Sequence, residues 1–181
     1  MSIDKSQVIP FPLPEHLASF ISHQIDSPIS LIGPQNNIEA KALHISRKRP
    51  LGKFILRCLK PGNKPSFIDK GFSIYISVSK YTRSSDQKIV PCRYSFIEFD
   101  EAEINEIISV FETLFRTALI SFLDGAQFGN SAKKKARGKF ASIIEFLQKY
   151  NLAHDDLAVE RYRKLYDREK KADKQLLHRF L

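Results

Sequence analysis

The feature that most constrains this chain is a wide apolar stripe at helical spacing, which begins just after Asp100. Asp100 is a good helix cap, and Glu103 follows three residues later, as in a capping box. Gly125 is a residue type that commonly ends a helix. The pattern predicts a helix over residues 101–123, which must bury its stripe against another part of the protein. The stripe consists of Ile104, Ile107, Ile108, Phe111, Leu114, Phe115, Ala118, Leu119 and Phe122.

Strand-like segments precede this helix. Residues 72–79 alternate strictly between apolar and hydroxyl-bearing side chains, which is the period of a half-buried strand. A polar loop separates them from a second β-rich run at 91–99, and further strands are predicted at 29–32, 41–48 and 53–60. The sequence therefore predicts an α+β fold, in which an antiparallel four- to five-stranded sheet packs on one long amphipathic helix and a basic helical C-terminal extension follows.

The chain is predicted to have three parts, which cover residues 1–28, 29–125 and 126–181. The first is an extended, proline-rich arm followed by a short helix from about Glu15 to Ile25. The second is the sheet with its long helix. The third contains a basic joint, a helix over 139–150 and a highly charged last helix over about 155–179. Two interpretations of the last helix stay open, namely a solvated helix with salt-bridged faces and a basic arm that contacts phosphates.

Positive charge is concentrated in two segments of the sequence. The 181 residues carry a net charge of +9, but residues 41–93 alone carry +11 and residues 131–181 carry +7. The other two segments, 1–40 and 94–130, are acidic. Segregated positive charge of this kind is typical of a surface that binds a polyanion.

Residue patterns for catalysis and for bound groups are missing from the sequence. The five His have no metal-ligand spacing, and there is no Cys-x-x-Cys, phosphate-binding glycine loop, nucleophile elbow or dinucleotide fingerprint. We therefore expect no enzyme activity, no metal and no cofactor. Cys58 and Cys92 lie in predicted strands, where buried thiols in a reducing compartment are expected. No apolar run can span a bilayer and the N-terminus lacks a signal-peptide pattern, so we expect a cytoplasmic protein with no membrane partner.

The outward side of the predicted sheet combines cations with tyrosine and serine side chains. Cations neutralise phosphates, Tyr75 and Tyr81 offer rings on which unpaired bases stack, and Ser77 can donate to phosphate oxygens. The alternative is that these tyrosines only pack across strands while the serines cover a solvated face. The predicted nucleic-acid-binding residues are Arg47, Lys48, Arg49, Lys53, Arg57, Tyr75, Ser77, Lys80, Tyr81, Arg83, Arg93, Lys133, Lys134, Lys135 and Arg137.

The segment from residue 74 to the start of the long helix resembles a known single-strand-binding fold. It contains Ile74-Tyr75-Ile76-Ser77-Val78-Ser79-Lys80-Tyr81, a polar loop, Pro91-Cys92-Arg93-Tyr94-Ser95-Phe96-Ile97-Glu98-Phe99 and an acid-capped helix. This order is similar to that of the PUR proteins, the Whirly proteins and the transcriptional coactivator called positive cofactor four. The resemblance implies nucleic-acid roles for Lys80, Tyr81 and Arg93. It also implies a homodimer formed through the helix, with an interface at Ile104, Ile108, Phe111 and Phe115.

The sequence thus predicts a non-catalytic protein that binds single-stranded nucleic acid, DNA in preference to RNA, with low sequence specificity. Lysine and arginine side chains are expected to neutralise phosphates while tyrosines stack on bases. The C-terminal helices are expected to add electrostatic contact or to recruit another protein. The alternative function is a protein-interaction module, or an assembly subunit, whose basic helical tail docks on an acidic partner.

Overall fold

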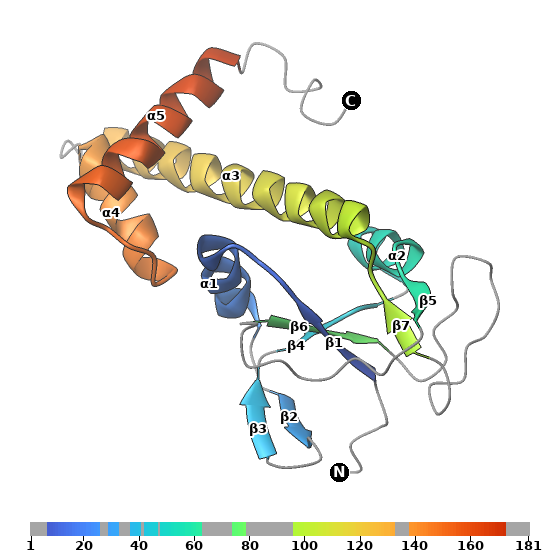
Figure 1. Ribbon diagram of the computed structural model, residues 1–181. Helices are drawn as coiled ribbons and strands as arrows, with labels where there is room; N and C mark the ends of the chain where they lie inside the picture. The colour runs from blue at the N-terminus through green and yellow to red at the C-terminus, as the bar shows by residue number, and fades with distance from the viewer. Residues whose placement is uncertain are drawn as a thin grey trace. The chain divides into compact units, whose positions relative to one another are not determined.

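The structure is a computed structural model, and Figure 1 shows its helices and strands. The chain divides into two compact units, Met1–Phe111 and Glu112–Leu181. The boundary between them falls inside the longest helix, α3 (Glu101–Ala132). The structure describes residues 7–25, 29–32, 37–40, 42–46, 48–62, 74–78, 96–132 and 138–172.

A three-stranded mixed sheet forms the centre of the first unit. Its middle strand is β6 (Ile74–Val78), which pairs antiparallel with β1 (Gln7–Phe11) and parallel with β4 (Ala42–His44). The proline-rich arm therefore docks on its own domain as an edge strand. An edge position suits Pro10, because proline cannot donate a hydrogen bond to a second neighbouring strand.

Both faces of β6 are covered, which corrects the predicted half-buried strand. Ile74, Tyr75, Ile76 and Ser77 are 1%, 2%, 1% and 1% exposed, respectively. Alternation separates two sets of side chains, but it does not show whether one set or both will be covered. The prediction that Tyr75 and Ser77 face outward is wrong, because this strand is the middle one and is buried on both sides.

Two strand pairs complete the described β-structure of the first unit. β2 (Ile29–Ile32) pairs antiparallel with β3 (Asn37–Ala40), and β5 (Lys60–Gly62) pairs antiparallel with β7 (Phe96–Glu98). β6 and β7 thus belong to different sheets. The predicted antiparallel four- to five-stranded sheet on one long helix is wrong: the described residues form five helices, a three-stranded mixed sheet and two strand pairs. Strand periodicity is local, and it does not determine which strands become partners.

The segment predicted as a strand over residues 53–60 is mostly a helix, α2 (Pro50–Arg57). Its first residue is a proline, whose fixed φ suits the first helical turn. Gly52, Ile55 and Leu59 are buried, which is the spacing of one helix face. An amphipathic run this short fits the strand and helix periods alike, so periodicity could not decide between them.

Helix α1 (Glu15–Gln24) forms where the sequence predicts it and buries an apolar face that includes Leu17 and Phe20. The sheet contributes Phe11, whose ring meets that of Phe99 edge-on at a centroid distance of 5.4 Å. The most deeply buried large side chains of the first unit are Phe11, Leu17, Ile55, Leu59, Ile74, Ile76 and Ile107.

Helix α3 begins as predicted and ends later than predicted. The Asp100 N–H donates to the Glu103 carboxylate at 3.1 Å, which is the reciprocal half of a capping box. The helix then continues through Gly125 to Ala132. Gly125 does not end the helix, because a glycine inside a helix costs only about 1 kcal/mol relative to alanine. The packing of the neighbouring turns contributes more stability than that.

The second unit packs the remainder of α3 against two further helices (Figure 1). They are α4 (Lys139–Lys149) and α5 (Asp156–Ala172). Phe146 of α4 is 0% exposed, and its ring centroid lies 5.8 Å from that of Phe115 and 5.5 Å from that of Phe122. Tyr162 of α5 also contacts the Phe115 ring, at 5.8 Å. Helices of the same chain therefore cover Phe115 and contact Phe122 of the apolar stripe, while Leu114 of the stripe is 44% exposed.

Polar contacts fix the rotation of α5 about its own axis. The Tyr166 hydroxyl donates to the Asp124 carboxylate at 2.7 Å, and Lys170 pairs with the same carboxylate at 2.7 Å. Lys139 of α4 pairs with Asp167 at 2.6 Å. The ammonium groups of Lys139 and Lys170 also lie over the Tyr166 ring, 5.1 Å and 5.9 Å from its centroid, respectively. One side of α5 is thereby held against α3 and α4.

We expect the second unit to lose stability between about pH 10 and about pH 12 through Tyr166. Burial and the hydrogen bond to Asp124 raise the pKa of Tyr166 to about 12, from about 10 in an unfolded chain. Because the folded-state pKa is the higher one, the contribution is complete below about pH 10 and is lost as the pH rises through about 12. Urea denaturation across this range measures the loss. Tyr166→Phe should make it shallower, and an equally steep loss in both proteins would contradict the assignment.

Candidate nucleic-acid interface

Four cations at the start and on one face of α2 form what we call the basic ridge: Lys48, Arg49, Lys53 and Arg57. All four residues are exposed. Arg49, Lys53 and Arg57 recur every four residues, so they lie in one row with about 6 Å of helical rise between neighbours. Lys48 adds a fourth charge in the turn that precedes the helix.

A tight turn holds the first part of the ridge. The Ser46 hydroxyl accepts from the Lys48 N–H at 3.3 Å, and the Ser46 carbonyl accepts from the Arg49 N–H at 3.3 Å. The helix starts there, with the Lys53 N–H donating to the Arg49 carbonyl at 2.9 Å. Gly52 allows the first turn of α2 to lie directly on Ser46, because a Cβ atom at position 52 would be 2.0 Å from the Ser46 carbonyl oxygen. Glycine at this position therefore determines how the ridge is presented.

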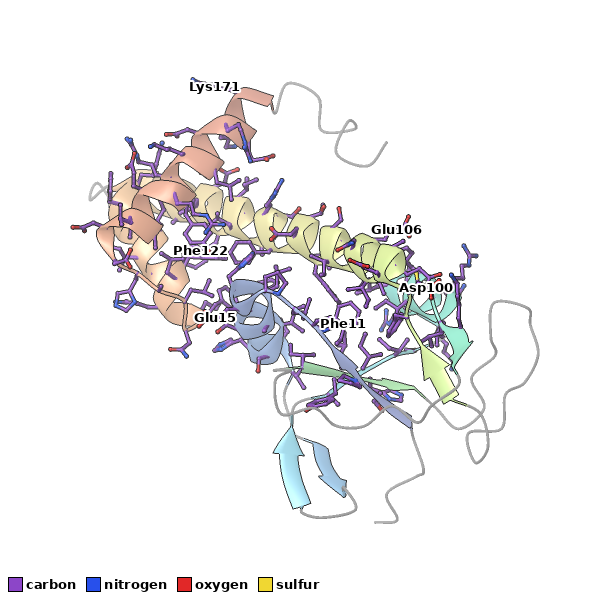
Figure 2. All side chains as sticks on the ribbon, in the orientation of Figure 1. Phe11, Glu15, Asp100, Glu106, Phe122 and Lys171 are labelled. Atoms are coloured by element: carbon purple, nitrogen blue, oxygen red, sulfur yellow. The ribbon has the colours of Figure 1, made fainter. Side chains whose placement is uncertain are left out.

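Burial and an ion pair anchor the other end of α2. Ile55 and Leu59 are each 0% exposed. Lys60 then pairs with the Asp100 carboxylate at the start of α3 (Figure 2), and its Nζ lies 3.0 Å from a Glu103 carboxylate oxygen. The hydrogen bonds to Asp100 and to Glu103 raise the pKa of Lys60. These two acids hold the chain after α2 in place, and they are engaged by Lys60 rather than by the ridge.

The charge of the ridge is not balanced locally. Residues 42–62 contain no Asp or Glu. In the described part of the chain, no carboxylate lies at ion-pair distance from any of the four ridge side chains. Neighbouring cations repel one another, so the ridge is stabilised when a polyanion neutralises it.

Cys58 closes α2 with a buried thiol. Burial and the nearby carboxylates of Glu103 and Glu106 raise the pKa of Cys58. The thiol therefore stays protonated at neutral pH, and a thiol is a poor nucleophile in that form. The prediction of a buried thiol is confirmed at Cys58, although on a helix end rather than a strand, and Cys92 lies outside the described residues.

The structure places some of the predicted binding residues together and buries others. The ridge residues gather on α2 and are exposed, although a turn and a strand were predicted to carry them. Tyr75 and Ser77 are 2% and 1% exposed, so neither can reach a base or a phosphate in this structure. The other predicted residues lie outside the described residues: Arg47, Lys80, Tyr81, Arg83, Arg93, Lys133, Lys134, Lys135 and Arg137.

Part of the predicted dimer interface is covered by the chain itself. Phe111 and Phe115 are 4% and 1% exposed. Because their surface is already buried within one chain, these two rings cannot form the predicted dimer interface in this structure. Ile104 and Ile108 are partly exposed. Homodimerisation through α3 stays a prediction.

The structure also exposes cations that the sequence interpretation did not select. From residue 158 to residue 171, every exposed residue of α5 is Lys or Arg. Their spacing was visible in the sequence, but the acids interspersed in the same helix concealed which cations would be exposed. These exposed residues are Arg161, Lys164, Arg168, Lys170 and Lys171.

Neither a membrane-spanning helix nor a metal site is found among the described residues. No helix there is long and apolar enough to cross a bilayer. Over the same residues, no three His, Cys, Asp or Glu side chains are grouped as metal ligands are. Comparisons with protein-family models, with curated proteins and with solved structures find no match to this chain.

Proposed function

We propose that this protein binds nucleic acid without catalysis and with little sequence specificity, through phosphate contacts of the basic ridge. The observation that carries the proposal is the locally unbalanced row of exposed cations on α2. Nucleic acid is the polyanion that such a row fits best, because its charges are densely and regularly spaced and each contact releases condensed counterions. Contacts of this kind supply affinity and orientation and carry no direct sequence information.

Base stacking is not part of this proposal. The predicted preference for single strands depended on Tyr75 and Tyr81, and Tyr75 is buried while Tyr81 lies outside the described residues. A helix that presents cations contacts the phosphate backbone of either a single strand or a duplex. The ridge is therefore proposed as a backbone-binding surface, with a single-stranded oligonucleotide as its simplest probe.

Replacing Arg49, Lys53 and Arg57 together by Ala is expected to weaken binding of a long labelled single-stranded oligonucleotide about 100-fold at ~0.1 M salt. For single strands, each phosphate contact contributes roughly 0.7 to the slope of log affinity against log salt. Three contacts therefore account for about two units of slope and, at ~0.1 M salt, for about two decades of affinity. Fluorescence anisotropy at several salt concentrations measures both quantities.

The matched control is the charge-conserving variant Arg49→Lys with Arg57→Lys, which should bind within a few-fold of the wild-type protein. The substituted positions are exposed and alanine is a strong helix former, so every variant should keep the wild-type circular dichroism and urea midpoint. Unchanged affinity of the alanine variant would overturn the ridge as the site. A wild-type protein that binds no oligonucleotide at low salt would overturn the function.

A further inference from the structure

The exposed side of α5 carries a second row of cations, which we call the α5 row: Arg161, Lys164, Arg168 and Lys171. They recur at intervals of three and four residues, so they lie on one helix face and span about 15 Å. Lys171 extends from the last described turn (Figure 2). All exposed residues between positions 158 and 171 are cations, and Leu157, which is 84% exposed, lies on the same face one turn before Arg161.

Packing of the opposite face fixes the direction in which the row points. Val159, Tyr162 and Tyr166 are 3%, 7% and 3% exposed. Tyr162 contacts the Phe115 ring, and the Tyr166 hydroxyl donates to Asp124, so this face lies on α3. The positions of the α5 row are about half a helical turn away from the buried positions and therefore face solvent.

Three of the four acids of α5 pair with cations outside the row. In the described part of the chain, the one ion pair of the row joins Lys164 to Glu160 at 3.8 Å, and Arg161, Arg168 and Lys171 have no carboxylate at ion-pair distance. The row therefore keeps most of its positive charge. The pairs formed outside it are Glu160 with Arg163 at 2.6 Å, Asp167 with Lys139 at 2.6 Å and Glu169 with Arg116 at 4.0 Å.

We propose that the α5 row is a second nucleic-acid contact, on the second unit of the chain; its ligand class rests on the proposed function. A phosphodiester backbone fits the row better than an acidic protein does, because protein interfaces depend on clusters of buried aromatic or aliphatic anchors and Leu157 is the one large apolar side chain exposed among the described residues of α5. A short oligonucleotide occupies the ridge and the α5 row separately. A longer strand that reaches both gains affinity through effective concentration.

Calorimetric titration of the full chain with oligodeoxythymidine at low salt tests this inference. An oligomer only long enough to cover one row is expected to bind twice per wild-type chain. It should bind once to the variant that carries Arg161→Gln, Lys164→Gln, Arg168→Gln and Lys171→Gln. With a long oligomer, the same variant should lower the salt slope by about three and the affinity at ~0.1 M salt by roughly 500-fold, since each of four contacts contributes about 0.7.

A charge-conserving variant, with lysine and arginine exchanged at the four positions, should bind the short oligomer twice. If the fourfold variant loses its wild-type circular dichroism, the pair Arg168→Gln and Lys171→Gln is measured in its place and should lower the salt slope by about 1.4. Wild-type stoichiometry together with an unchanged slope in the folded variant would overturn the inference.

The outcomes also separate this inference from the proposed function. If only the ridge variant loses affinity, the α5 row is overturned and the proposed function stands. If only the α5 variant loses affinity, the α5 row is supported and the ridge is overturned. If neither variant loses affinity, both are overturned. Polyglutamate that competes as well as oligodeoxythymidine of equal charge would indicate an acidic protein as the partner and would overturn the α5 row as a nucleic-acid contact.

Discussion

A Phe146→Ala variant is expected to lose about 3–5 kcal/mol of the free energy of unfolding of the second unit. Phe146 is 0% exposed, and its ring centroid lies 5.8 Å from Phe115, 5.5 Å from Phe122 and 4.8 Å from Tyr150. Truncation removes these ring contacts and leaves a cavity that packed helices fill only in part. Urea denaturation followed by circular dichroism measures the loss.

Phe140 offers a matched control in the same helix. Its side chain is 49% exposed, and the guanidinium of Arg163 lies 5.6 Å from its ring centroid. Phe140→Ala removes only this exposed contact, so it should cost less than about 1 kcal/mol. Equal losses in the two variants would mean that α4 does not pack on α3 through Phe146.

The ring cluster around Phe146 shows what could be predicted about α3 and what could not. Capping and periodicity are local properties, so the start of α3 and the extent of α4 could be predicted within a residue or two. The surface that covers an apolar stripe is not a local property. The resemblance to the single-strand-binding fold implied a second chain as the partner of this stripe. In the structure, α4 and α5 of the same chain cover Phe115 and Phe122.

The charge of the ridge could be predicted, whereas its geometry could not. The excess of lysine and arginine over residues 41–93 is visible in the sequence. Residues four positions apart, such as Lys53 and Arg57, lie on one face in a helix and in a strand alike, and eight residues are too few to separate the two periods. The deciding contact is the approach of Gly52 to the Ser46 backbone, and nothing in the periodicity of the segment encodes that contact.

The α5 row shows a different limit of sequence reasoning. The last helix contains both signs of charge, so its net charge did not distinguish a solvated, salt-bridged face from a phosphate-binding one. Three of its acids pair with Arg163, Lys139 and Arg116, and two of these cations lie on other helices. Only this three-dimensional pairing shows which cations are left unmatched.

Gly52→Ala is expected to destabilise the first unit by at least about 3 kcal/mol, at the upper end of the range for overpacked sites. The added Cβ atom would lie 2.0 Å from the Ser46 carbonyl oxygen and 2.9 Å from the Ser46 carbonyl carbon. Both are backbone atoms, so no change of rotamer relieves the clash, and either α2 or the preceding turn must move. That movement displaces Arg49 and Lys53, so oligonucleotide affinity should fall together with the urea midpoint.

Gly125→Ala makes the same change inside another helix and is the matched control. Gly125 is exposed, and a Cβ atom there would meet nothing within 4 Å. Alanine should therefore raise the stability by about 0.5–1 kcal/mol through its better helix propensity and leave the affinity unchanged. Opposite signs for the two substitutions would show that contact with Ser46, and not helix propensity, explains the glycine at position 52. A neutral or stabilising Gly52→Ala would refute that contact, and with it the arrangement of turn and helix that forms the basic ridge.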